Sequence, residues 1–321
     1  MKLRCRRSLR LGKNGSYNQD AMNRRHFLSL AAVPVLAQPP ADSNQTISLD
    51  VTRVNLLFTV SDKRGRFVTN LVKEDFEVIE VKKKQTILEF AAESNLPLRI
   101  AMLVDTSNSI KERFRFELDA AGQFLQSVVR REKDRAMVYS FDTQPQLVQD
   151  LTDDTELLAK RLRELRPGGG TALYDCIYMA CRDRLMMDQP RHKFRRALIM
   201  VGDGDDNSSK YSRDQALEMA LNAEVVIYAI STNMSRVESE GDKVLKYFTA
   251  ETGGVAFFPF KAADLAQDFE NIANELRSQY SILYKPEPLK ADGLYHPVEI
   301  KVKLRKDLVV RARKRYHSPK S

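Results

Sequence analysis

Three oxygen-bearing side chains stand at alternate positions directly after an apolar run in this chain. The run 101–104 ends at Asp105, and Ser107 and Ser109 follow it. A D-x-S-x-S loop suits a hard divalent cation, because Mg²⁺ prefers oxygen ligands at near-octahedral geometry and usually keeps several waters. Asp and Ser are common residues, so the pattern is informative only together with the rest of the chain.

Two later turns carry similar residues. Thr171 follows three consecutive glycines at 168–170, and a second apolar run that begins at 197 is followed by Asp203. The carboxyl ends of strands in open α/β sheets form the ligand crevice, so loops far apart in sequence converge there. Glycine tolerates backbone angles that other residues avoid, which would let the Thr171 loop approach an ion closely. The alternative is that Thr171 caps the following helix. The candidate metal ligands are therefore Asp105, Ser107, Ser109, Thr171 and Asp203.

The charge of the chain is concentrated at its beginning. The 321 residues carry a formal net charge of +9, but residues 1–37 hold eight Lys and Arg against one acidic residue. The remainder has 44 basic and 42 acidic residues, a net of +2, so we do not expect a nucleic-acid ligand. A hydrophobic fraction of 43% is enough for a globular core.

Residues 1–37 resemble a twin-arginine export signal. Arg24 and Arg25 precede a short apolar segment that ends at Leu36, too short to span a bilayer as a mature helix. An ordinary signal peptide or an uncleaved anchor is the alternative, and Met22 is an alternative start. No other stretch of about 18 apolar residues follows, so we expect an exported chain, periplasmic or extracellular, without a membrane span. Cys176 and Cys181 are predicted to be buried and unpaired. They stand five residues apart in one predicted helix, so their side chains point in different directions around its axis and are badly placed for a disulfide.

The pattern along the chain predicts a linker, a β segment, an α/β domain and a second β segment. Residues 38–46 are the linker, 47–96 the N-terminal β segment, 97–280 the α/β domain and 281–321 the C-terminal β segment. Within 97–280, strands are expected at 98–105, 135–141, 196–202, 224–231 and 254–259, and helices at 110–131, 172–187, 213–223, 241–252 and 262–278. This alternation predicts a doubly wound, mostly parallel sheet with helices on both faces. The two flanking segments are each too short to bury a core alone, so we expect them to form one small antiparallel unit.

The motifs together resemble the von Willebrand factor type A domain with its metal-ion-dependent adhesion site. The likeness covers about residues 97–280, and the flanks resemble bacterial exported proteins of the VWFA-related type. It implies one Mg²⁺ or Mn²⁺ per chain, held by Asp105, Ser107, Ser109, Thr171 and Asp203, that captures an Asp or Glu of a protein partner in adhesion or assembly. The stretch 81–84 (Val-Lys-Lys-Lys) departs from the acidic-Gly turn expected there, which puts that hairpin's geometry in question.

Other chemistries fit the sequence less well. Residues 203–214 imitate an EF-hand loop, but Ser208 stands where that turn needs glycine. The glycines at 168–170 lack the Lys-Ser/Thr of a phosphate-binding loop, and no G-x-S-x-G or H-E-x-x-H motif occurs, so we expect no enzyme. Two alternatives stay open. A Mg²⁺-dependent hydrolase or phosphatase would use Asp105 as nucleophile or metal ligand, and a structural scaffold would keep only a vestigial metal site.

Overall fold

The computed structural model describes residues 53–92, 96–108, 114–235, 237–303, 305 and 307–318. All of them belong to one compact unit, Leu49–Ser321. The predicted leader and linker lie outside the described residues. None of the helices in the described part of the chain is long and apolar enough to cross a membrane.

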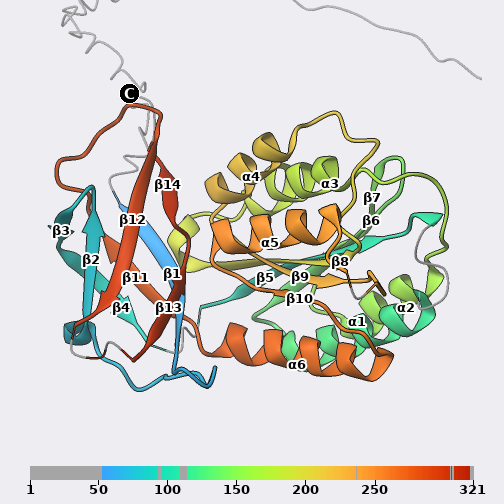
Figure 1. Ribbon diagram of the computed structural model, residues 1–321, viewed down its shortest axis with the longest axis horizontal. Coiled ribbons are helices and arrows are strands. Elements are labelled where there is room, and N and C mark those ends of the chain that lie inside the picture. The colour runs from blue at the N-terminus through green and yellow to red at the C-terminus, as the bar shows by residue number, and fades with distance from the viewer. Residues whose placement is uncertain are drawn as a thin grey trace, which may run out of the picture. The chain divides into compact units, whose positions relative to one another are not determined.

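A six-stranded sheet forms the centre of the α/β part (Figure 1). Its order is β10-β9-β8-β5-β6-β7, and only β7 runs antiparallel to its neighbour. The inner strands are apolar along their whole length because helices cover both faces of the sheet. The predicted doubly wound, mostly parallel sheet is confirmed. The strands are β5 (Leu98–Asp105), β6 (Arg135–Phe141), β7 (Pro145–Thr152), β8 (Arg195–Gly202), β9 (Val225–Ser231) and β10 (Ala256–Phe257).

Helices cover both faces of this sheet (Figure 1). One layer comprises α1 (Phe114–Val128), α2 (Thr155–Glu164) and α6 (Ala262–Arg277), and the other α3 (Leu173–Ala180), α4 (Arg213–Asn222) and α5 (Glu240–Thr252). Each layer buries its own apolar cluster against the strands. Beyond α3 the predicted helix continues only as the π-helical turn Cys181–Leu185. Cys176 and Cys181 are buried and free, as predicted.

Two elements, β7 and α2, were absent from the sequence-based assignment. Strand β7 (PQLVQDLT) is a half-exposed edge strand, so it shows neither a continuous apolar run nor strict alternation. Helix α2 has ten residues, and its N-cap Asp154 accepts a hydrogen bond from the Leu157 N–H at 3.0 Å. An aspartate before a short apolar stripe is a usable start signal for such a helix.

The flanking segments form two four-stranded antiparallel sheets. Their orders are β13-β1-β11-β4 and β14-β12-β2-β3, so each sheet mixes strands from both ends of the described chain. Rings of Phe58, Phe76 and Tyr280 meet between the sheets with centroids 5.1 to 5.5 Å apart. The expected β unit built from both segments is confirmed, whereas the boundaries at 97 and 280 stay predictions. The strands are β1 (Val54–Ser61), β2 (Phe76–Glu80), β3 (Lys83–Gln85), β4 (Ile87–Ala91), β11 (Tyr280–Tyr284), β12 (Tyr295–Val302), β13 (Val309–Ala312) and β14 (Arg315–His317).

The turn between β2 and β3 is a two-residue hairpin turn. Val81 has φ 46° and Lys82 has φ 65°, so both residues occupy the left-handed region that a type I′ turn requires. Asn-Gly or Asp-Gly normally supplies these angles, and a β-branched residue there is strained. The hairpin forms despite the unusual sequence because β2 also pairs with β12 over Phe76–Glu80.

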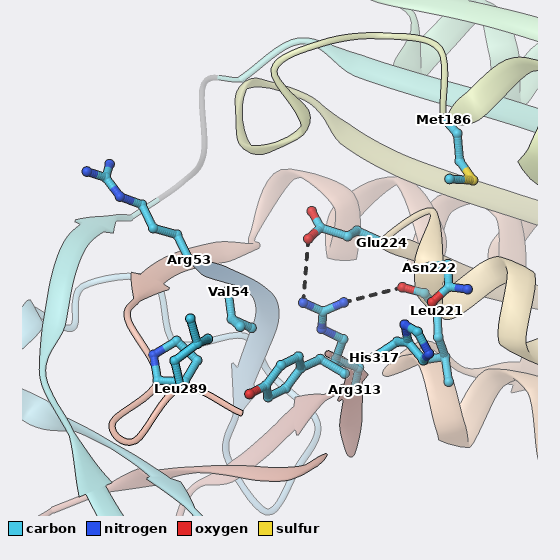
Figure 2. A pocket seen from close by; sticks show the side chains of 11 residues that line it. Arg53, Val54, Met186, Leu221, Asn222, Glu224, Leu289, Arg313 and His317 are labelled. Carbon is cyan, nitrogen blue, oxygen red and sulfur yellow. Dashed lines mark hydrogen bonds and ion pairs between the residues drawn. The ribbon is translucent and has the colours of Figure 1, made fainter. Parts of the chain in front are cut away.

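A buried arginine joins the β unit to the α/β part. Arg313 lies between β13 and β14, is 8% exposed, and donates from Nη2 to the Asn55 carbonyl at 2.6 Å. Figure 2 shows its guanidinium between Glu224 and the Leu221 carbonyl, beside a cavity of about 290 Å³. The ion pair to Glu224 measures 3.7 Å, and the bond to the Leu221 carbonyl 3.5 Å. One cation therefore contacts β1, the end of α4 and the start of β9.

Relieving the strained turn should stabilise the protein. We expect Val81→Asn/Lys82→Gly to raise the free energy of unfolding by about 1–2 kcal/mol, because both new residues tolerate positive φ. Urea denaturation measures it. Lys84→Gly, at an extended residue of β3 that pairs with Glu77, should lower the same quantity. A double variant that is no more stable than the parent protein would contradict the conclusion that the turn at Val81 and Lys82 is strained.

Replacing Arg313 should lower the free energy of unfolding far more than replacing an exposed arginine. Arg313→Met leaves the Glu224 carboxylate without its cation and removes one donor from the carbonyls of Asn55 and Leu221, so we expect about 3 kcal/mol lower stability by urea denaturation. Arg305→Met, which breaks the exposed pair with Asp307, should change stability by less than about 1 kcal/mol. Equal losses in the two variants would show that Arg313 is no stabilising link.

Candidate metal centre

Asp105 ends β5 in the middle of the sheet and is fully buried. Its Oδ1 accepts a hydrogen bond from the Ser107 N–H at 2.7 Å, which turns the chain back over the carboxylate. Its Oδ2 is buried and has no hydrogen-bond partner among the residues that the structure describes. Buried carboxylate oxygens are normally paired, so an orphaned one calls for a physical explanation such as an ion.

The electrostatic environment of Asp105 is strongly negative. Burial is the main cause that raises its pKa to about 7, and the charges of Asp203 and Asp205 add to the rise. Hydrogen bonds from Ser107 act in the opposite direction. Burial and the charge of Asp203 also raise the pKa of Asp205. The buried Asp105 carboxyl thus lies near the half-buried Asp203 and the exposed Asp205, and a divalent cation would stabilise its charged form.

The glycine-rich loop is tied to the Asp105 loop and to its neighbours. The Gly168 N–H donates to the Thr106 carbonyl at 2.6 Å, and the Ala172 N–H donates to the Asp142 carbonyl at 2.7 Å. Gly169 has φ 79°, an angle that favours glycine. A Cβ at Gly170 would stand 2.6 Å from the Ser208 Oγ, so only glycine permits this approach. The expectation that these glycines allow close packing of the Thr171 loop agrees with these contacts.

Thr171 itself is 4% exposed and is held by the loop after β8. Its N–H donates to the Asn207 Oδ1 at 2.9 Å, and its carbonyl accepts from the N–H groups of Asn207 and Ser208. Helix α3 begins at Leu173 with Ala172 as N-cap, and no side chain caps it through Ala172. Thr171 is therefore not the N-cap residue of α3.

Asp203 follows directly after β8. The preceding Gly202 is so close to Asp105 that a Cβ there would lie 2.8 Å from the Asp105 Cβ. The Asp203 Oδ1 accepts from the Asp205 N–H at 3.1 Å, which curls the loop at its start. The same loop is fixed further on, since the Asp206 Oδ2 accepts from the Tyr174 N–H at 3.0 Å near the start of α3.

The structure thus places the Asp105, Thr171 and Asp203 segments in one loop cluster at the carboxyl ends of β5 and β8. Ser107 is buried in the same cluster, and Ser109 lies outside the described residues. Sequence reasoning missed Gly202, which sets the approach of β8 to Asp105, and Asn207, which fixes Thr171. The only sequence signal for either was its place beside Asp203.

Among the described residues, no group of three or more His, Cys, Asp and Glu side chains is arranged to hold a metal ion. The predicted ligand set contains only two carboxylates, and its other members are hydroxyls. Such a set leaves a dication with little charge compensation, so an open coordination position would stay electrophilic.

Comparison with known proteins supports the resemblance. Residues 100–205 match the family model of the von Willebrand factor type A domain, a stretch that contains all five predicted ligands. The predicted likeness to this domain is confirmed there. No curated protein matches the chain.

Several solved structures are similar to part of the chain. The PilB minor pilin from Streptococcus sanguinis is 11% identical with a TM-score of 0.47, covering 59% of this chain and 63% of its own. The vWF domain of the type V pili tip protein Mfa5 from Porphyromonas gingivalis is 16% identical with a TM-score of 0.46, covering 56% and 95%. Proximal thread matrix protein 1 from the mussel byssus, with a zinc-occupied MIDAS motif, is 18% identical with a TM-score of 0.47, covering 59% and 48%. This chain spans less than two thirds of the minor pilin.

Filling the space at Gly202 should disturb Asp105 directly. We expect Gly202→Ala to lower the free energy of unfolding by about 1–3 kcal/mol, because the new methyl group meets the Asp105 Cβ rather than a flexible side-chain end. Gly168→Ala is the matched control, since nothing lies within 4 Å of a Cβ there. The control should change stability by less than about 0.5 kcal/mol in urea denaturation. Equal effects in the two variants would contradict the close packing.

Proposed function

We propose that this chain is an exported, non-enzymatic protein-binding module that uses Mg²⁺ or Mn²⁺ to capture a carboxylate of a protein partner. The observation that carries the proposal is the buried Asp105 Oδ2, which has no hydrogen-bond partner in the described part of the chain and lies in the electric field of Asp203 and Asp205. An oxygen atom of this kind is suited to bind a cation, because burying an unpaired carboxylate otherwise costs several kcal/mol.

Each residue of the proposed site has a separate task. Asp105 and Asp203 supply the negative charge, and the hydroxyls of Ser107, Ser109 and Thr171 complete the set as neutral ligands. Asp205 contributes through its charge, which helps to raise the pKa of Asp105. Asn207 holds the Thr171 loop in place from behind.

The bound ion would supply a Lewis-acidic position for an incoming carboxylate. A partner's Asp or Glu is the suitable ligand, because it compensates charge that the hydroxyls leave unbalanced. The match of residues 100–205 to the von Willebrand factor type A domain supports this proposal, since the resemblance implies a metal-bridged contact of that kind. Adhesion or assembly is the corresponding role.

Export is proposed from the sequence of the leader. The arginine pair Arg24 and Arg25 and the short apolar segment after it favour the twin-arginine route, with a periplasmic or extracellular destination.

Titration calorimetry of Mg²⁺ and Mn²⁺ into the metal-stripped protein tests the proposal. We expect saturable binding of one ion per chain, with no binding in Asp105→Ala because that change removes the central carboxylate. Acetate, standing in for a partner's side chain, should raise the affinity for the ion, since two ligands that complete one shell strengthen each other reciprocally.

Two control variants sharpen this test. Asp205→Asn should weaken ion binding without abolishing it, because it removes charge and keeps the ligands. Asp119→Ala, an exposed carboxylate of α1 that pairs with Arg163, should leave binding unchanged. Absence of ion binding to the parent protein, both with and without acetate, would refute the proposed site. Equal ion binding by Asp105→Ala would show that the ion binds at another site.

A further inference from the structure

Exposed apolar side chains lie at the end of the sheet that carries the proposed metal site. Met234 and Val237, which follow β9, are 55% and 74% exposed, and Phe260, which follows β10, is 55% exposed. Strands β8, β9 and β10 are parallel neighbours, so their carboxyl ends lie at one edge of the sheet. Single exposed apolar residues are common, but several at one place mark an interaction surface. Met234, Val237 and Phe260 are called the apolar patch below.

One lysine links the two segments that carry the patch. Lys246, on α5, forms an ion pair with Glu238 at 2.6 Å, and its Nζ lies 4.9 Å from the centroid of the Phe258 ring. Glu238 directly follows Val237, and Phe258 lies two residues before Phe260. The segments after β9 and β10 are therefore close to each other, and the charged side chains between them are paired.

Hydrogen bonds fix the described part of the loop after β9. The Asn233 Nδ2 donates to the buried Asp242 carboxylate at 2.7 Å, and the Asn233 Oδ1 accepts from the Ser235 N–H at 2.9 Å. The Val237 N–H donates to the Ser235 Oγ at 3.1 Å. Polar groups of the loop are thus bonded within it, while the side chains of Met234 and Val237 are exposed. Exposed apolar surface is unfavourable in water unless a partner covers it.

The same loop lies directly against the segment of the proposed ligand Asp203. The Thr232 N–H donates to the Gly202 carbonyl at 3.1 Å. The backbones of Gly204 and Gly241, the latter in the first turn of α5, are so close that neither position has room for a Cβ. These contacts fix the place of the apolar patch relative to the proposed metal site.

A partner that brings a carboxylate to the ion would also cover this patch. Neighbouring strands lie about 4.8 Å apart, which places the end of β10 about 14 Å from that of β5, three strands away. A stable protein–protein contact buries about 800 Å² on each partner, which is a round area of about 16 Å radius. An area of that size centred on Asp105, at the end of β5, includes the ends of β9 and β10.

We propose that the apolar patch is the specificity surface of the proposed metal site, and that it selects a partner segment with an apolar side chain two positions from its Asp or Glu. This role rests on the proposed function, because the ion brings the carboxylate to this edge of the sheet. Alternate residues of an extended segment are about 7 Å apart, which exceeds the step of about 4.8 Å from β8 to β9. The ion binds any carboxylate, and the patch discriminates among the segments that carry one.

Fluorescence anisotropy with two labelled peptides in excess Mg²⁺ tests this proposal on the whole chain. One peptide is Gly-Leu-Gly-Glu-Gly-Leu-Gly, and the other has Ser in place of both Leu. We expect the Leu peptide to bind at least about fivefold more tightly, because it buries apolar side chains that the Ser peptide lacks. Met234→Ser/Val237→Ser should abolish this preference, and Mg²⁺ binding measured by calorimetry should stay unchanged because both residues lie outside the ligand set.

Met187→Ser/Val72→Ser is the matched control. It makes the same changes at residues that are 71% and 54% exposed and that precede β8 and β2, away from the carboxyl ends of the sheet. This variant should keep the full preference for the Leu peptide. Loss of the preference in the control as well would show that it does not depend on the apolar patch and would overturn the proposal.

The remaining outcomes separate this proposal from the proposed function. Equal binding of the two peptides by the parent protein, or a preference that survives Met234→Ser/Val237→Ser, would overturn the specificity role and leave carboxylate capture intact. A preference for Leu that persists in chelator would show that the apolar contact does not serve the ion, which also overturns that role. Failure of both peptides to bind, with normal Mg²⁺ binding, would refute carboxylate capture and the specificity role together.

Discussion

The burial of one carboxylate is the constraint on which the loop cluster depends. Asp105 ends a strand that lies between two others, so its side chain cannot turn toward bulk water. The chain accommodates it with one hydrogen bond from Ser107 and with glycine at position 202, where any side chain would collide. The second oxygen, Oδ2, has no hydrogen-bond partner among the described residues, and the charges of Asp203 and Asp205 act on the same carboxyl.

A second constraint comes from the ends of the described chain. Strand β1 lies between β11 and β13, and β2 lies beside β12, so neither terminal segment completes a sheet without the other. Arg313 fastens this unit to the α/β part through backbone carbonyls of β1 and α4. The same arrangement leaves β12 and β13 in different sheets.

The sequence predicts the features that burial makes visible. The inner strands that end at Asp105, Phe141 and Ser231 were recognisable because helices on both faces require continuous apolar runs. Strand β7 and helix α2 were missed, since half-exposed elements mix polar and apolar residues. The candidate ligands were predicted from their residue types, from their places after apolar runs and glycines, and from the resemblance to the von Willebrand factor type A domain. The contacts of Gly202 with Asp105 and of Asn207 with Thr171 were not, because they depend on the register of β8 against β5 and on loop conformation, which no local pattern encodes.

We infer that the Asp105 Oδ2 binds an ion. A crystal structure of the protein grown with MnCl₂, with anomalous scattering recorded at the manganese edge, is the decisive experiment. We expect an anomalous peak bonded or water-bridged to the Asp105 carboxylate, with the Ser107, Ser109 and Thr171 hydroxyls around it. A well-ordered loop cluster with no peak beside Asp105, or with a water or side-chain donor bonded to Oδ2 instead, would contradict it.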